Sequence, residues 1–267
     1  METLREGSNG PDVVALQTRL RAQGFPPGAI DGNFGPGTEA AVIAFQRSEG
    51  LVPDGVVVPQ TAQALGVAPA DLPPPEMPEI TVAIVAKMFP VTPLGHINAN
   101  LPRVLTALSE AKLTTLPIVL AALATIRAET EGFLPISEFL SRFNTSPNGH
   151  PFDLYDFRQD LGNQGPPDGA NFKGRGFVQL TGRTNYTTFG PLVDVRNLVD
   201  EPEQANDPDI AARLLAAFIS SKRVAIASAL AANDLAAARR LVNGGSHGLD
   251  QFVSAYQIGA SLLTPTS

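Results

Sequence analysis

The sequence predicts a mainly α-helical protein in two parts, a small three-helix bundle followed by a larger helical domain. Three observations support this prediction: a short internal repeat near the N-terminus, a proline-rich stretch after it, and a long apolar helical pattern further along the chain. With 267 residues, of which 43% are hydrophobic and 17% charged, the chain can form hydrophobic cores in both parts.

A proline-rich stretch separates the two parts. Five prolines fall within residues 66–78, and proline both fixes φ and removes the backbone N–H that a helix needs. Such a segment is stiff and extended. We therefore predict a first domain at residues 1–66, a linker at 67–78 and a second domain at 79–267.

The first part contains an internal repeat that predicts its helices. The segment Asp31–Thr38 recurs as Asp54–Thr61, and both copies combine an Asp-Gly turn with a proline at a helix start. Apolar residues at helical spacing flank the first copy, namely Val13, Leu16, Leu20, Phe25, Ala41, Val42 and Phe45. This pattern predicts three short helices around a small core.

A long apolar pattern in the second part predicts a buried helix from Thr115 to Glu131. Its apolar residues repeat at intervals of three and four. Gly132 suits the left-handed position after the last turn, and Pro135 prevents the helix from continuing. Glu131 shares a face with Arg127 one turn earlier, so we expect an ion pair between them.

Glu129 lies nearly opposite Glu131 on this predicted helix. Its neighbours on that face are apolar, and no cation lies one turn away. The negative end of the helix dipole and the apolar neighbours both disfavour the ionised form, so we expect a raised pKa for Glu129. Such surroundings keep a carboxylic acid protonated near neutral pH.

Glu138 is the next carboxylate along the chain. In one straight helix, Glu129 and Glu138 would lie ~13 Å apart along the axis and on opposite faces. A chain that reverses at Gly132–Pro135 can instead bring Glu138 across a cleft from Glu129. Two carboxyls ~6.5–9.5 Å apart leave room for a water, which is the geometry of inverting glycoside hydrolysis. Alternatively, Glu138 is an exposed acid in the first turn of a following helix.

The composition excludes several classes of function. The absence of cysteine rules out disulfides, thiolate nucleophiles and cysteine-ligated metal sites. The formal charge of −7 disfavours nucleic acid as a partner. The histidines His96, His150 and His247 are widely separated, and we expect neither a metal nor another cofactor.

Membrane insertion is not expected. The uncharged apolar stretch Ile118–Ile126 has nine residues, against the roughly 20 that a membrane span needs. The first residues lack the basic and apolar segments of a secretory signal, so we expect synthesis in the cytoplasm. A compact monomer is the expected state.

Residues 4–65 resemble the three-helix peptidoglycan-binding module. The apolar positions alone are what any small three-helix bundle needs, so the resemblance rests on the ordered series of Gly and Asp-Gly turns between them. The matching residues are Leu4-Arg5, Gly7, Val13, Leu16-Gln17, Leu20, Gly24-Phe25, Asp31-Gly32-Asn33-Phe34-Gly35, Thr38, Ala41-Val42, Phe45-Gln46, Gly50-Leu51, Asp54-Gly55 and Thr61. The resemblance implies that peptidoglycan glycan strands are the partner.

The second part, from about Met88 to Phe252, resembles the chitinase and endolysin group of glycoside hydrolase family 19. The motifs that carry the resemblance are Ala128–Phe133, Tyr155–Arg158, Gly162-Asn163, Pro167–Gly169, Phe172–Tyr186 and Val242–Gly245. It implies a lysozyme-like α-helical domain that hydrolyses β-1,4 glycosidic bonds between N-acetylated sugars.

The resemblance also implies roles for single residues. Glu129 corresponds to the general acid, in a motif where Ala128 replaces the usual histidine of the family. Glu138 corresponds to the second acid of related phage endolysins, the base that activates water. Positions that hold the nucleophilic water and the N-acetyl group of the substrate correspond to Gln179, Thr181 and Asn185.

Three further residues complete the predicted substrate-binding set. Arg175, between two glycines, either orients a carboxylate and lowers its pKa or forms a buried structural ion pair. Tyr186 belongs to the same motif, and only three tyrosines and 14 phenylalanines remain for stacking on sugars in a chain without tryptophan. Asn243 either lines the cleft, as the resemblance implies, or ends a helix.

From the pairing of the two parts we expect a muramidase, specifically a phage endolysin. Such a protein is made in the host cytoplasm and acts on the wall in the periplasm after release by a separate pore-former. The alternatives are a chitinase or secreted antibacterial toxin of the same fold, and a catalytically silent cell-wall-binding protein.

Overall fold

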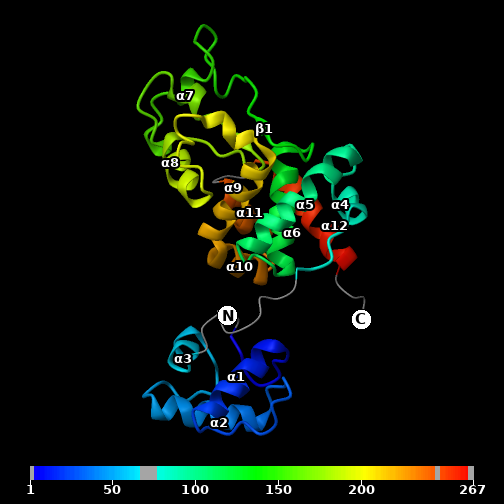
Figure 1. Ribbon diagram of the computed structural model, residues 1–267, viewed down its shortest axis with the longest axis vertical. Helices are drawn as coiled ribbons and strands as arrows, with labels where there is room; N and C mark the ends of the chain where they lie inside the picture. The colour runs from blue at the N-terminus through cyan, green and yellow to red at the C-terminus, as the bar shows by residue number, and fades with distance from the viewer. Residues whose placement is uncertain (1–2, 67–76, 244–246, 264–267) are drawn as a thin grey trace. The chain divides into compact units, whose positions relative to one another are not determined.

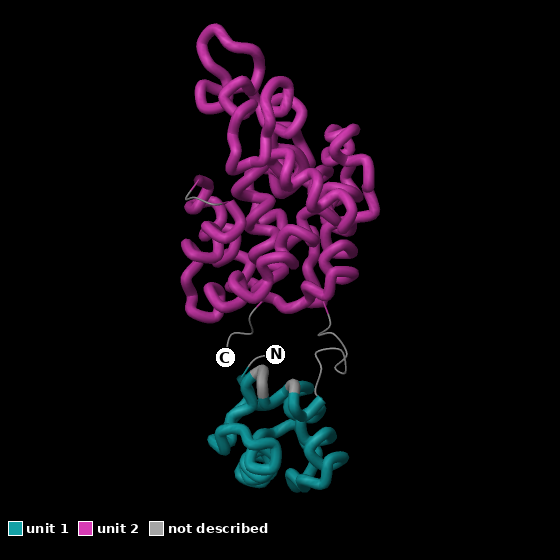
Figure 2. The backbone as a smooth tube through the Cα atoms, turned by 90° about the vertical axis from the view of Figure 1, so that its left-hand side faces the viewer, with its two compact units in different colours: residues 1–76 teal, residues 77–267 magenta. Residues whose placement is uncertain are grey.

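The computed structural model in Figure 1 describes residues 3–66, 77–243 and 247–263. Contacts between Cα atoms divide the chain into two compact units, residues 1–76 and 77–267 (Figure 2). Both units are built mainly from helices, which confirms the predicted fold class. The predicted linker lies outside the described residues, except that positions 77 and 78 belong to the second unit.

The first unit consists of three helices around a small core. They are α1 (Pro11–Ala22), α2 (Pro36–Ser48) and α3 (Pro59–Ala64). The apolar residues singled out in the sequence all contribute to this core, Phe25 from its edge. The predicted three-helix bundle is therefore confirmed, with a proline at the first position of each helix.

A buried glutamine explains why the Asp-Gly turn occurs twice. Gln17 of α1 donates from Nε2 to Asp31 Oδ1 and to Thr38 Oγ1, both at 3.1 Å, and accepts the Gly32 N–H at 3.0 Å. Gln46 of α2 makes the equivalent three bonds with Asp54, Thr61 and Gly55. Each turn is thus held to a preceding helix by one amide that uses both its donor and its acceptor.

The second unit contains nine further α-helices and two short strands within its described residues. In chain order these are α4 (Val82–Met88), α5 (Leu94–Glu110), α6 (Leu116–Thr130), β1 (Ile136–Ser137), α7 (Asp168–Asn171), β2 (Arg175–Gly176), α8 (Arg183–Leu192), α9 (Pro208–Ser221), α10 (Arg223–Ala231), α11 (Leu235–Asn243) and α12 (Leu249–Leu263). Helix α6 lies at the centre and packs against α9, α10, α11 and α12 (Figure 1). Every residue from Ile118 to Ile126 is buried, as expected of a helix with apolar residues on all sides.

Helix α6 ends where the sequence predicts, but by a different conformation. Glu131 and Phe133 take positive φ values of 49° and 53°, whereas Gly132 does not, so the predicted left-handed glycine is wrong. Asn100 of α5 holds this turn by donating to the Phe133 carbonyl at 3.0 Å. The predicted ion pair of Glu131 with Arg127 is present, at 3.0 Å.

After this turn the chain reverses and forms a two-residue antiparallel pair. Ile136 of β1 lies opposite Gly176 of β2, and Ser137 lies opposite Arg175. Glu138 follows β1 directly and lies in no helix, so the alternative of an acid in a helical first turn is wrong. Its N–H donates to the Gly174 carbonyl at 2.7 Å.

Helices α9 and α10 follow each other across a bend of 71°. Within the part of the chain that the structure describes, no single helix is long and apolar enough to cross a membrane, and only this bent pair passes such a test of length and composition. The apolar residues of α9 form part of the core, among them Ala211, Leu214, Leu215 and Ile219.

Candidate active site

Glu129 lies in the last turn of α6, where it meets a cation from a distant part of the chain. Arg239 of α11 is fully buried, and its Nη1 lies 2.8 Å from Glu129 Oε1. The Glu129 side chain is itself only 10% exposed. The two residues are 110 positions apart in the sequence, and the packing of α11 on α6 brings them together.

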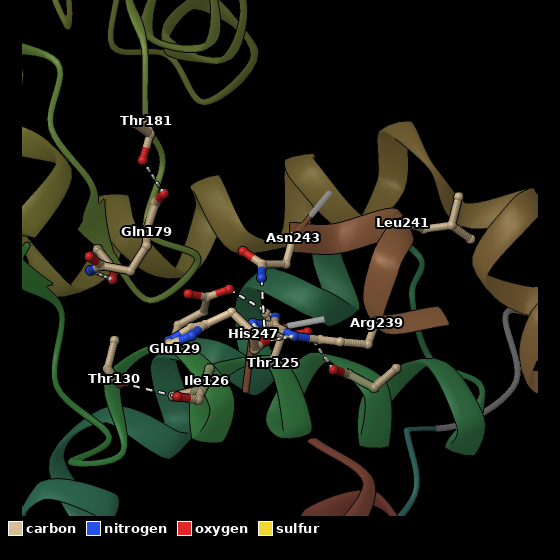
Figure 3. A network of polar contacts seen from close by, with 12 residues as sticks. Thr125, Ile126, Glu129, Thr130, Gln179, Thr181, Arg239, Leu241, Asn243 and His247 are labelled. Carbon is tan, nitrogen blue, oxygen red and sulfur yellow. Dashed lines mark hydrogen bonds and ion pairs between the residues drawn. The ribbon is translucent and has the colours of Figure 1, made fainter. Parts of the chain in front are cut away.

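Arg239 also fixes the segment that follows α11. Its Nε and Nη2 donate to the His247 carbonyl at 3.0 and 2.8 Å. Asn243, at the end of α11, donates from Nδ2 to the same carbonyl at 3.3 Å. Figure 3 shows how Glu129, Arg239, Asn243 and His247 converge at the ends of the two helices. The glycines after Asn243 lie outside the described residues.

These surroundings favour the protonated form of Glu129. Burial raises its pKa, and the nearby Arg239 guanidinium and, more weakly, the His247 side chain oppose this without cancelling it. The direction is the one expected from the sequence. A buried cation beside the carboxyl was not expected, and it moderates the shift.

Glu138 is surrounded differently, by three neutral donors. Its Oε1 accepts from Asn144 Nδ2 and from the Tyr155 hydroxyl, both at 2.9 Å, and its Oε2 accepts the Gly174 N–H at 3.2 Å. Burial and the neighbouring Glu138 carboxylate raise the pKa of Tyr155 to about 12, so this phenol remains a donor near neutral pH. Because a carboxylate offers roughly four acceptor positions, Oε2 keeps one position open.

Gln179 and Thr181 lie around Gly174, on the same side as Glu138. A Cβ on Gly174 would come within 2.8 Å of Gln179 Oε1 and within 3.3 Å of both Thr181 Oγ1 and Glu138 Oε2. The Gln179 amide nitrogen donates to two carbonyls of the β1–β2 pair, at 2.8 and 3.0 Å, which directs its oxygen towards Gly174. The Thr181 hydroxyl donates to the Gln179 carbonyl at 2.9 Å. The structure thus brings Glu138, Gln179 and Thr181 together around a residue that has no side chain.

Asn185 contacts the backbone of this group. Its Nδ2 donates to the Thr181 carbonyl at 2.7 Å, so the amide nitrogen holds the Thr181 backbone in place. The side chain is half-buried at the start of α8.

Two of the predicted substrate-binding residues serve the core instead. Tyr186 is fully buried, and its hydroxyl accepts from Arg175 Nη1 at 3.0 Å and donates to the Lys173 carbonyl at 2.9 Å. A ring enclosed in this way offers no face to a sugar, so that prediction is wrong. Arg175 is also buried, and its described partners are neutral oxygens, including the Asn171 carbonyl at 2.6 Å. Neither predicted role for Arg175, with a catalytic carboxylate or in a buried ion pair, agrees with these contacts.

The predicted residues therefore fall into two networks. One contains Glu129 and Asn243, joined through Arg239, and the other contains Glu138, Gln179 and Thr181. In Figure 3 the Glu129 side chain rises from α6 with the Gln179 loop on one side and Asn243 on the other. A separate cavity of about 220 Å³ includes none of the predicted residues; it is lined by Met88, Pro90, Arg127, Asp250, Gln251 and Ser254. Among the described residues, no group of three or more His, Asp or Glu side chains is placed to hold a metal ion.

Sequence reasoning missed three residues that contact the two carboxylates. Arg239 had no distinguishing signal, because Arg240 follows it directly in the same alanine-rich segment. Asn144 is likewise one polar residue among many between Glu138 and Tyr155. Tyr155 was identified only as part of a motif, and its bond to Glu138 depends on how the intervening loop folds back.

Comparison with known families identifies the first unit. Residues 9–65 match the family described as "Putative peptidoglycan binding domain". The N-terminal unit therefore contains a domain of this peptidoglycan-binding class.

Similar proteins share only part of their length with this chain. The N-acetylmuramoyl-L-alanine amidase CwlM of Mycobacterium tuberculosis is 45% identical over 56 residues, which are 21% of this chain and 14% of that protein. The zinc D-Ala-D-Ala carboxypeptidase of Streptomyces albus G is 49% identical over 63 residues, or 22% of this chain and 24% of that protein. The chain thus spans a quarter or less of the length of these curated relatives.

Among solved structures, the chitinase C of Streptomyces griseus HUT6037 covers 70% of this chain and 79% of its own, with 20% identity and a TM-score of 0.45. The endolysin of the Burkholderia AP3 phage covers 97% of this chain and 100% of its own, with 22% identity and a TM-score of 0.32. Both scores are below 0.5, so neither likeness supports a functional assignment, which depends on the site residues themselves.

Proposed function

We propose that the protein hydrolyses the β-1,4 glycosidic bonds of bacterial peptidoglycan as a muramidase of the glycoside hydrolase family 19 type. Glu129 is the general acid and Glu138 the general base in this proposal. The observation that carries it is the contrast between the two carboxyls: one is buried with a raised pKa, and the other accepts three hydrogen bonds. Carboxyls whose surroundings differ in this way suit the acid and base roles of one reaction.

Glu129 has the properties that a general acid requires. Because burial raises its pKa, a larger fraction of the carboxyl is protonated near neutral pH than in water. The Arg239 bond to Oε1 leaves Oε2 to carry the proton towards the glycosidic oxygen. As the leaving sugar departs with this proton, the carboxylate that forms is stabilised by the adjacent guanidinium.

Glu138 has the properties that a general base requires. Its bonds to Asn144 and Tyr155 fix the carboxylate, and the open position on Oε2 can accept a proton from water. Gln179 Oε1 and the Thr181 hydroxyl lie close to the same Oε2 and can orient that water. Attack by a water held on the face opposite Glu129 inverts the anomeric centre.

The N-terminal domain supports peptidoglycan as the substrate. A domain of the peptidoglycan-binding class, tethered to a hydrolytic unit, raises the local concentration of glycan strands. The relatives compared above are named as an N-acetylmuramoyl-L-alanine amidase and a zinc D-Ala-D-Ala carboxypeptidase. In this proposal the protein is an endolysin: it is made in the host cytoplasm, reaches the wall in the periplasm after a separate pore-former acts, and causes lysis.

The proposal is tested by incubating purified peptidoglycan with the native protein, Glu129→Gln and Glu138→Gln, and by measuring new reducing ends. Each substitution should lower the rate by roughly 10²–10⁴-fold, as expected when a general acid or base is lost. Glu131→Gln is the matched control, since Glu131 is 61% exposed at the end of the same helix. The reducing-end sugar should be N-acetylmuramic acid, and NMR should detect the α-anomer first.

Other outcomes contradict specific parts of the proposal. Reducing ends on N-acetylglucosamine would indicate a glucosaminidase, and preferential release of sugars from chitin would indicate a chitinase. Absence of reducing ends with every protein would leave a wall-binding role without hydrolysis.

A further inference from the structure

The exposed phenylalanines of the protein are concentrated in one segment beside Glu138. All 14 phenylalanines of the chain lie within the described residues. Only Phe139, Phe143 and Phe157 are largely exposed, at 76%, 73% and 72%. Leu140 and Leu154 of the same segment are exposed as well. We refer to these five residues as the phenylalanine rim.

The rim is fixed to the Glu138 carboxylate. Asn144 donates to Glu138 Oε1 and to the Phe139 carbonyl, both at 2.9 Å. The Leu154 N–H donates to the Asn144 carbonyl at 3.3 Å, and Tyr155 donates to Glu138. Phe157 packs against Gly165, where a Cβ would lie 3.0 Å from the ring. The exposed rings are therefore presented by an ordered segment.

Such a grouping indicates a binding surface. Single exposed apolar residues are common on protein surfaces, but clustered ones mark sites of interaction. Aromatic rings are effective there because they supply a large contact area and lose little conformational freedom. The chain has no tryptophan, and of its three tyrosines Tyr186 is fully buried while Tyr155 and Tyr256 are half-buried. The rim therefore provides the most exposed aromatic faces among the described residues.

The charge of the segment favours a carbohydrate over a lipid surface. Between positions 139 and 158, Arg142 and Arg158 are balanced by Asp153 and Asp156. Binding to anionic lipid depends on clustered Lys and Arg next to the apolar residues, and this balance provides none. A sugar ring offers an uncharged C–H face that stacks on aromatic rings, with hydroxyl groups at its edge for neighbouring polar side chains.

We propose that the phenylalanine rim binds the glycan strand where it continues beyond the bond being cleaved, on the Glu138 side of the site. This inference rests on the proposed function, because it extends that same substrate along the surface. The rim then contributes affinity for long strands and does not take part in the chemical step.

The first test measures hydrolysis of soluble, peptide-free glycan strands by the full chain. Phe139→Ser, Phe143→Ser and Phe157→Ser are made singly and together. The triple variant should raise KM roughly tenfold while kcat stays within about twofold, because stacking that is equal in the ground and transition states changes binding alone. Leu192→Ser together with Val224→Ser is the matched control, since these exposed apolar residues lie on α8 and α10. Thermal midpoints establish that all variants fold.

The second test does not require hydrolysis. Hydroxyl-radical oxidation of Phe139, Phe143 and Phe157 is compared with and without glycan strands, in the Glu129→Gln protein. Glycan should protect the three rings, and vesicles of phosphatidylethanolamine and phosphatidylglycerol should not. Protection by vesicles alone would indicate a lipid surface and overturn the inference, as would unchanged KM with no protection by glycan. Protection by glycan in Glu129→Gln, together with a native protein that releases no reducing ends, would support the rim and refute the proposed hydrolysis.

Discussion

Glu129 and Glu138 are nine positions apart in the chain, but the protein surrounds them in different ways. Glu129 ends a buried helix and is paired with one fully buried cation, Arg239, from 110 positions away. Glu138 follows a two-residue strand, is half-buried, and accepts from three neutral donors among the described residues, all within 36 positions. A long-range contact between helices builds the first environment, and a folded loop builds the second.

This difference shows how one chain can give two chemically identical groups different properties. Burial raises the pKa of Glu129 even with a guanidinium beside it, because the loss of hydration outweighs the attraction. The donors around Glu138 are uncharged, so they fix its carboxylate without neutralising its charge. Changes to Arg239 should therefore alter the protonation of Glu129, and the loss of a donor around Glu138 should alter the position of its carboxylate.

The largest effect is expected from Arg239→Met. Removing one partner of a buried pair leaves the other uncompensated, which costs about 3–5 kcal/mol in the free energy of unfolding. The lost bonds to the His247 carbonyl add to this cost. Urea unfolding of this variant is compared with Arg240→Met, whose side chain is exposed at the next position. Equal losses in the free energy of unfolding of the two variants would show that the contact between Arg239 and Glu129 does not stabilise the fold.

The same variant tests the protonation of Glu129. Because burial raises the folded-state pKa, the unfolded chain loses this proton first as the pH rises past 4.5, so the free energy of unfolding falls with rising pH until the folded carboxyl also ionises. Without Arg239, the pKa of Glu129 in the folded protein rises further. The pH range over which the free energy of unfolding falls therefore widens, and the alkaline limb of the hydrolytic rate moves to higher pH. An unmoved limb would exclude Glu129 as the titrating acid.

A smaller effect is expected from Tyr155→Phe. The substitution removes one hydrogen bond to the Glu138 carboxylate, which is worth about 1.5 kcal/mol. The hydrolytic rate should fall by roughly tenfold if that bond positions the base. The pKa of Tyr155 is raised to about 12, so ionisation of the phenol should not change this loss between neutral pH and about pH 9. Tyr256→Phe, in a half-buried tyrosine stacked on Phe252, is the control and should leave the rate unchanged.

The smallest effect is expected from Glu131→Gln. Glu131 is 61% exposed, and its 3.0 Å contact with Arg127 Nη1 lacks the geometry of a hydrogen bond. Arg127 is only 13% exposed, but its partner Glu131 remains in water, so we expect the contact to contribute about 0.5 kcal/mol or less and to be screened by salt. The free energy of unfolding of Glu131→Gln, measured at low and at high salt, should differ from that of the native protein by no more than about 0.5 kcal/mol. A loss above about 1 kcal/mol would remove the distinction between this pair, whose acid is exposed, and the buried pair of Arg239 and Glu129.

The sequence predicted much of the fold because its signals are local. The Asp-Gly turns identified the first unit, since each turn and the helix start after it lie within eight residues. The apolar repeat identified α6, and the one-turn spacing of Arg127 and Glu131 identified their ion pair. The prediction at Gly132 was wrong because bonds from α5, such as that of Asn100, hold the turn in a conformation that local preference does not select.

The candidate site was predictable only in part. The sequence predicted Glu129, Glu138, Gln179 and Thr181 as site residues. It also predicted a substrate contact for Tyr186, and either a catalytic carboxylate or a buried ion pair as the partner of Arg175. Periodicity cannot reveal that Tyr186 is enclosed by the core, or that the bonds of Arg175 go to neutral oxygens. A motif specifies which residues are present, but not which of them face solvent, as for Tyr186, or which atoms they contact, as for Arg175.

The sequence by itself determined the helices, the turns of the first unit and the positions of the two carboxyls on either side of a chain reversal. Each of these depends on residues close together in the chain, where backbone preferences and side-chain spacing are decisive. Only the tertiary structure placed Arg239 against Glu129 and wrapped the Asn144 and Tyr155 loop around Glu138. Those contacts depend on how helices and loops pack, and packing depends on the shape of the whole unit.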